Sequence, residues 1–154
     1  MFGKIKNWMG IEGAKLRFHV LPSYPHNIPT INGELEVFAK RQQTITAIEI
    51  KFYEIYTNGR GDEKRIDEYL LGTWSSEELI MVDDGFPQNV FFKLHYQKAE
   101  SNMDKIAKKG FLQKGLVGFA KSMKGIKSTY RLEARANVEG VSWQVFTKTP
   151  IEFG

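Results

Sequence analysis

Cysteine is absent from this chain of 154 residues, and histidine occurs three times. The lack of cysteine excludes a disulfide framework and any metal site with thiolate ligands. His19, His26 and His95 lie on separate expected elements, without the short spacings at which two histidines share a zinc ion. We therefore expect no metal site, and we expect His19 and His95 on the solvent-facing side of strands.

Motifs that carry catalysis are missing too. No glycine-rich phosphate loop follows an expected strand, and the G-x-S-x-G nucleophile elbow does not occur. Asp83 and Asp84 could contact a calcium ion, but two acids before Gly85 are more typical of a tight turn. The sequence thus predicts a protein that is not an enzyme and holds no cofactor.

Long apolar runs are also lacking. No stretch approaches the roughly 20 apolar residues of a membrane-spanning helix, and the start of the chain does not resemble a signal peptide. The hydrophobic content of 42% is that of a globular protein. A chain of this length can form one domain that buries roughly two thirds of its unfolded surface. We expect a single cytoplasmic domain over residues 1–154.

What the chain does contain is a repeated alternation of apolar and polar residues, the pattern of strands with one buried face. The expected strands cover residues 14–21, 33–39, 44–56, 64–74, 75–82, 90–96 and 128–138, followed by a short pairing of 143–146 with 151–153. Pro150 is expected on an edge strand. Seven or eight antiparallel strands at this spacing predict an all-β fold, an immunoglobulin-like or arrestin-like β-sandwich.

Two local features refine this fold. The apolar positions switch face between Ala47 and Ile48, which indicates either a β-bulge or burial of both faces. The turn sequence at 58–62 joins two strand-like segments and predicts a hairpin. That turn contains the adhesion tripeptide Arg-Gly-Asp, which we interpret as turn chemistry.

One basic segment, Met103–Lys127, interrupts the strands. It carries seven lysines and one acid, a charge of +6, whereas the whole chain sums to +4 (22 minus 18), which leaves −2 for the remainder. Segregated charge of this kind suggests an anionic surface or partner. The candidate contact residues are Lys105, Lys108, Lys109, Lys114, Lys121, Lys124 and Lys127.

Helical spacing within this segment predicts a basic helical insertion at about 101–127, before the last strands. Five apolar residues share one helical face: Leu112, Leu116, Phe119, Met123 and Ile126. Four glycines disfavour an unbroken helix and favour two short helices or one mobile helix. The insertion could be a connection packed on the sandwich, a surface for anionic membranes, or part of a groove for a protein partner. A second, short helix is expected over Phe2–Gly13, packed on the sheet or lying at a membrane surface.

The chain resembles an arrestin-like β-sandwich, most closely the bacterial sporulation-control relatives of arrestins. The residues that carry the resemblance are the amphipathic start Phe2–Gly13, the glycine-initiated Gly33–Val37 before the isoleucine-rich Ile45–Ile55, and the closing Tyr130–Val138 and Lys148–Ile151. The basic segment occupies the place of the family's basic helical insertion. The chain departs from the family in having length for one sandwich where arrestin-like proteins usually have two.

The resemblance implies a non-enzymatic intracellular scaffold or adaptor that binds a protein partner, in a developmental or stress pathway. The alternative is a peripheral membrane-binding module that uses segment 103–127 against an anionic membrane surface. Nucleic acid is not expected as a partner, because the segment has lysine without arginine. A single sandwich leaves strand edges exposed, so we also expect a homo-oligomer, formed through the edge near Ile151–Phe153.

Overall fold

The computed structural model describes residues 13–59, 65–97 and 127–154. The described part consists of eight strands: β1 (Lys15–His19), β2 (Thr30–Phe38), β3 (Gln43–Asn58), β4 (Arg65–Ser76), β5 (Ile80–Val82), β6 (Gln88–His95), β7 (Lys127–Val138) and β8 (Gln144–Ile151). The two helices expected from the sequence fall outside it, apart from Gly13, which lies in a bend, and Lys127, which begins β7.

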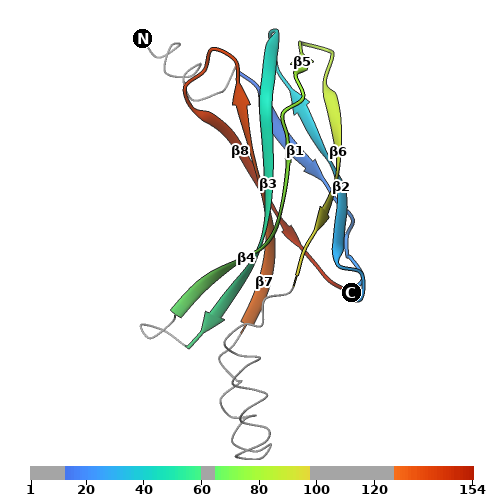
Figure 1. Cartoon of the computed structure of the whole chain (residues 1–154), viewed down its shortest axis with the longest axis vertical. Coiled ribbons are helices and arrows are strands. Elements are labelled where there is room, and N and C mark those ends of the chain that lie inside the picture. Colours follow the sequence, from blue (N-terminus) through green and yellow to red (C-terminus); the bar gives the residue numbers. More distant parts are fainter. Residues whose placement is uncertain (1–12, 60–64, 98–126) are drawn as a thin grey trace, which may run out of the picture.

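The strands form two antiparallel sheets, as expected for a β-sandwich (Figure 1). One sheet has three strands in the order β1-β2-β6. The other has the order β4-β3-β7-β8, and β5 adds to the end of β3. The lower ends of β3, β4 and β7 extend past the three-stranded sheet (Figure 1). β1 and β8 are border strands of their respective sheets, and they lie next to each other on the same side of the sandwich.

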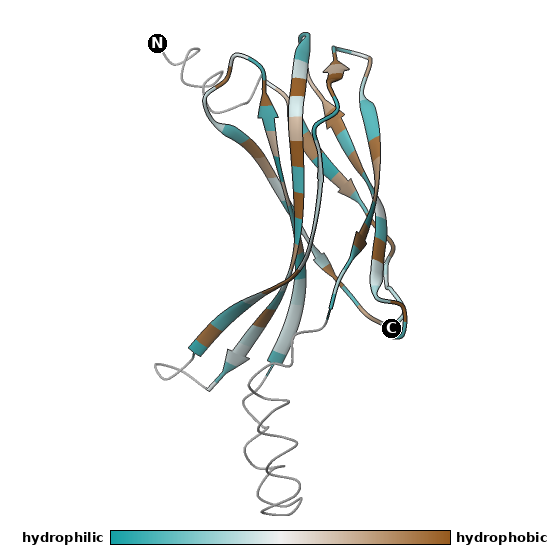
Figure 2. Ribbon diagram, viewed as in Figure 1, coloured by the Kyte–Doolittle hydropathy of each residue, from teal (hydrophilic) through white to brown (hydrophobic). Residues whose placement is uncertain are grey.

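The core lies between the two sheets and is built by the predicted alternation, visible as bands along the strands in Figure 2. The fully buried side chains come from both sheets and include Leu35 and Leu94 from one sheet and Ile50, Phe52 and Leu132 from the other. Burying apolar area of this kind contributes about 25 cal/mol per Å², which is the main stabilisation available to a chain without disulfides. The alternation predicted for strands with one buried face is confirmed in β1, β2 and β6.

Both local features predicted for β3 are confirmed. The pairing of β3 with β7 shifts register between Ile45 and Ala47, directly before the predicted change of face between Ala47 and Ile48. Consequently Ile45 and Ile48 are both buried, although three residues apart in a strand. β3 and β4 form the expected hairpin, with Asn58 opposite Arg65 at its last described pair.

Three expectations about strand ends were wrong. Gly33 lies inside β2 and does not open it. A glycine at this position is explained by packing, since a Cβ there would lie 2.8 Å from the ring of Phe92. Residues 144–151 form one edge strand that includes Pro150, not two short pieces that pair with each other. Lys127 was expected at the end of a helical segment but pairs with Thr57 as the first residue of β7.

The edge at the C-terminal end of the chain is covered within the molecule. Tyr24 donates its N–H to Glu152 at 2.9 Å and accepts from the N–H of Gly154 at 3.0 Å, a parallel bridge opposite Phe153. The ring of Phe153 contacts Tyr130 with centroids 4.8 Å apart. The edge near Ile151–Phe153, predicted to pair with another copy, is therefore already occupied by the loop that follows β1.

Candidate functional site

Most of the basic segment Met103–Lys127 lies outside the residues that the structure describes. Of the seven candidate lysines, Lys127 alone lies among the described residues, exposed at the start of β7, and the other six lie outside them. Their role in binding a partner or a membrane stays a prediction. In the described ranges no helix is long and apolar enough to cross a membrane.

His19, His26 and the acidic turn at Asp83 and Asp84 make contacts with nearby residues of the fold. His19 Nε2 lies 2.7 Å from Glu36 Oε1, and His26 stacks on Phe153 with centroids 5.6 Å apart. The N–H of Asp84 donates to Asp83 Oδ1 at 2.8 Å inside the turn, where Gly85 has φ of 78°. Among the residues with described positions, no three histidine or carboxylate side chains gather where they could hold a metal ion.

A groove of about 570 Å³ runs between the border strands β1 and β8, and we call it the edge groove. Its walls are residues 14–18 with Phe38 on one side and 143–149 on the other. Each wall is a strand paired on one side only within the described chain: β1 with β2, and β8 with β7. The edge groove is thus bounded by backbone that can pair with a further strand.

The lining of the edge groove is aromatic and basic. Arg17 lies over the ring of Phe38 at 4.9 Å, and the neighbouring Arg135 lies over the ring of Phe146 at the same distance. The charged residues that line it are Lys15, Arg17 and Lys148, and no acidic side chain is among the lining residues. Glu36 is 3.8 Å from Arg17 and compensates that charge in part. The edge groove is therefore electropositive.

Pro150 shows which backbone groups of β8 face the edge groove. A proline inside a ladder is tolerated where its nitrogen points away from the paired strand. Pro150 lies opposite Arg131 in the pairing of β7 with β8, so its nitrogen is expected on the open side. Because backbone groups alternate along a strand, Lys148 and Phe146 should also turn their N–H toward the edge groove.

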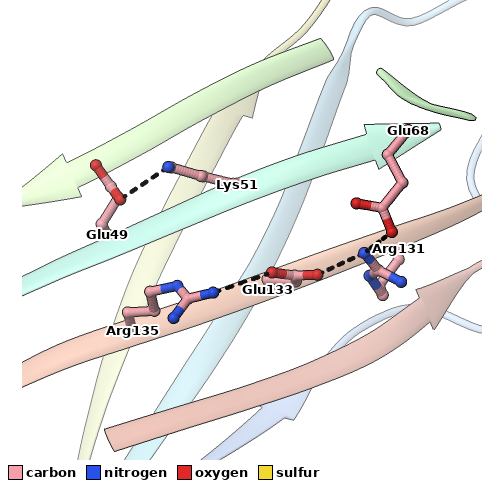
Figure 3. A network of polar contacts seen from close by, with 6 residues as sticks. All are labelled: Glu49, Lys51, Glu68, Arg131, Glu133 and Arg135. Carbon is pink, nitrogen blue, oxygen red and sulfur yellow. Dashed lines mark hydrogen bonds and ion pairs between the residues drawn. The ribbon is translucent and has the colours of Figure 1, made fainter. Parts of the chain in front are cut away.

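A second polar arrangement lies on the outer face of the five-stranded sheet, shown in Figure 3. Arg131 on β7 reaches across β3 to Glu68 on β4 at 2.9 Å, and it pairs with Glu133 on its own strand at 2.6 Å. Burial alone would lower the pKa of Arg131, but the hydrogen bonds and charges of the two carboxylates outweigh it and raise that pKa. The positive and negative charges of this group compensate each other. Such an ion-pair network is more typical of a stabilising contact between strands than of a ligand site.

Sequence reasoning missed the edge groove. Its two walls are about 125 residues apart in the chain, and alternation alone does not say which strands end up at the borders of the two sheets. Pro150 was a usable signal, since it correctly indicated an edge strand. The sequence analysis assigned the binding surface to the lysines of 103–127 because they are concentrated in one segment. The basic residues of the edge groove, Lys15, Arg17 and Lys148, are far apart in the sequence.

Comparisons with known proteins show the fold and little more. No family model matches the chain, and no curated protein matches it. Among solved structures the chain is similar to the crystal structure of Spo0M, a sporulation control protein from Bacillus subtilis, with a TM-score of 0.57 and 12% sequence identity. The similarity covers 91% of this chain and 49% of Spo0M, so the chain spans about half the length of that protein.

Proposed function

We propose that this protein is a non-enzymatic intracellular adaptor of the arrestin-like type, which binds an extended segment of a protein partner in the edge groove. The observation that carries the proposal is the groove itself, about 570 Å³ between two border strands. The fold likeness to a sporulation control protein supports the arrestin-like assignment and a role in a developmental or stress pathway. Such a partner would add a strand to the sheet.

The chemistry of the edge groove favours an acidic partner segment. Lysine and arginine line it without an acidic side chain, so a segment with Asp, Glu or a phosphorylated residue gains charge complementarity. The rings of Phe38 and Phe146 offer apolar contacts for alternate side chains of an extended chain. Backbone pairing would supply affinity, and these side chains would supply selectivity.

A proline substitution in β8 separates backbone pairing from side-chain contacts. Lys148→Pro removes the lysine side chain and an N–H expected to face the edge groove, whereas Lys148→Ala removes the side chain beyond Cβ and keeps the N–H. Each variant and the wild type are used as bait in a lysate of the protein's own cell, and captured proteins are identified by mass spectrometry. We expect a specific set of partners that K148A captures more weakly and K148P loses.

Hydrogen exchange then locates the contact. Addition of a captured partner's acidic segment as a synthetic peptide should slow amide exchange in β1 and β8 and leave β4 unchanged. Equal capture by K148P and K148A, or protection confined to other strands, would remove the edge groove from the proposal. The urea midpoint of each variant shows whether it remains folded.

The alternative function, peripheral membrane binding through segment 103–127, gives a different result. It predicts sedimentation with vesicles of anionic lipid, absence of binding to neutral vesicles, and release by salt, because exposed charges are screened within about 8 Å at physiological ionic strength. The K148P and K148A substitutions lie in β8 and should not change that binding. Adaptor and membrane binder are therefore separable with the same three proteins.

A further inference from the structure

The lower half of β4 is a sheet border distinct from the edge groove. β4 pairs with β3 on one side, and near Leu71 its other side is met by the end of β6, where the N–H of Gln97 donates to the carbonyl of Leu71 at 3.1 Å. Below that point, residues 65–70 have no strand on their outer side within the described ranges (Figure 1). Such an edge can pair with another strand.

Two apolar side chains on this border are exposed. Ile66 is 58% and Leu70 is 52% exposed. Their partners in β3 are Thr57 and Tyr53, which places both on the outer face, with Glu68 between them. An isoleucine and a leucine at this exposure on an unpaired border differ from the lysines and prolines that usually protect sheet edges.

The spacing of these side chains is self-complementary. When two copies of β4 pair antiparallel about a two-fold axis at Glu68, Ile66 of each copy lies opposite Leu70 of the other. This register brings all four exposed apolar side chains into cross-strand pairs on one face. Glu68 then faces Glu68 of the second copy, and each is already paired with its own Arg131 at 2.9 Å.

We propose that the protein forms a two-fold dimer through β4, in the register that sets Ile66 against Leu70 of a second copy. The five-stranded sheets of the two copies become one continuous sheet, and the interface is isologous. β8, and with it the edge groove, lies at the opposite border of the sheet and stays accessible. The interface is small, so the dimer is expected to be weak and dependent on concentration.

Sedimentation velocity of the full chain between about 5 and 500 μM tests the dimer. We expect a monomer–dimer equilibrium that Ile66→Lys weakens at least tenfold by placing an ammonium opposite a leucine. The matched control is Leu79→Lys, since Leu79 is 72% exposed and lies outside β4. Glu68→Gln, which removes the like charges at the axis, should tighten association about two- to fivefold.

Cross-linking tests the register, and the absence of natural cysteine makes it unambiguous. Opposed residues in antiparallel strands have Cα atoms about 4.5–5.5 Å apart, within the range of a disulfide. Under mild oxidation, Glu68→Cys should cross-link to itself, and a mixture of Ile66→Cys and Leu70→Cys chains should cross-link to each other. Ile66→Cys alone should react no faster than Leu79→Cys.

Either of two results would overturn the proposal. The first is a single monomeric species up to 500 μM. It would mean that the β4 border pairs with a strand of some other protein or remains unpaired. The second is a dimer that Ile66→Lys and Leu79→Lys affect equally, which would place the interface elsewhere. Circular dichroism of each variant distinguishes loss of the dimer from loss of the fold.

Discussion

At the scale of single residues, Tyr24 links the loop after β1 to the rest of the sandwich. Its side chain is buried, its hydroxyl donates to the carbonyl of Asn32 at 2.5 Å, and the N–H of Leu21 donates to that hydroxyl at 3.2 Å. Burial raises the pKa of Tyr24 above its ordinary value of 10.0, and the hydrogen bond from Leu21 opposes the shift. The fold therefore favours the neutral phenol.

Tyr24→Phe should cost about 1 kcal/mol in the free energy of unfolding at neutral pH, because both hydrogen bonds are lost. A raised folded pKa gives stability that is present below pH 10.0 and lost as the pH rises through the folded pKa. The difference in the free energy of unfolding between wild type and Tyr24→Phe should therefore shrink above pH 10.0. Urea unfolding at pH 7, 9 and 11 measures it, and a constant difference would contradict the raised pKa.

Gly72 lies where β4 closely approaches the end of β6. A side chain there would meet the carbonyl oxygen of His95 and would come within 2.9 Å of Leu94 Cδ2. Gly72→Ala should destabilise the protein by about 1–3 kcal/mol, because backbone cannot move aside as a flexible side chain can. Thr73→Ala, at an exposed position next to it, is the control and should change the urea midpoint little. Equal effects of the two substitutions would mean that the sheets are not in contact here.

At the scale of strands, Arg131 joins β7 to β4 across β3. Arg131→Met leaves Glu68 and Glu133 without their shared cation, and we expect a loss of about 1–2 kcal/mol in the free energy of unfolding. Arg135→Met removes a more exposed cation with one ion pair at 3.7 Å, and it should cost at most about 0.5 kcal/mol. The loss for Arg131→Met should also diminish in high salt. A loss for Arg135→Met as large as that for Arg131→Met would contradict the bridging role.

The strands show how far sequence reasoning extends. The hairpin of β3 with β4 and the bulge near Ala47 were predictable because each follows from residues close in sequence. Gly33 was wrongly predicted to start a strand. The reason for a glycine at this position is the ring of Phe92, which lies about 60 residues away in the sequence and leaves no room for a side chain. The edge at Phe153 was misread for the same reason, because Tyr24 covers it from the other end of the chain. Long-range placement, which local pattern does not encode, accounts for both.

At the scale of the whole molecule, the two proposed surfaces lie on opposite borders of one sheet. In the proposed dimer the strand order becomes β8-β7-β3-β4-β4-β3-β7-β8, so the two edge grooves are the outermost features. Seven interstrand spacings of about 4.8 Å separate them by roughly 34 Å across the sheet. Phe146 in the edge groove is level with Arg135, whereas the axis at Glu68 is level with Thr129, so the two grooves are also offset by roughly 40 Å along the strands and lie roughly 50 Å apart. The dimer would thus present two sites for acidic segments at a defined separation, an arrangement suited to a partner with two such segments.

Linker length tests this arrangement. A fully extended chain covers at most about 3.3–3.6 Å per residue, so two acidic segments need a connection of at least about 15 residues to occupy both edge grooves. A peptide with two captured segments and a flexible 20-residue linker should bind the dimer 10-fold or more tighter than a single segment, because the second contact is intramolecular. With a 5-residue linker the gain should vanish.

The monomeric variant supplies the decisive comparison. Ile66→Lys should bind the single segment with unchanged affinity, because Ile66 lies on the border opposite the edge groove, and it should lose the gain from the 20-residue linker. Isothermal titration of both peptides against both proteins gives the four affinities needed. A gain that persists in the Ile66→Lys variant would show that both segments bind one copy of the chain, and the dimer would then have no part in avidity.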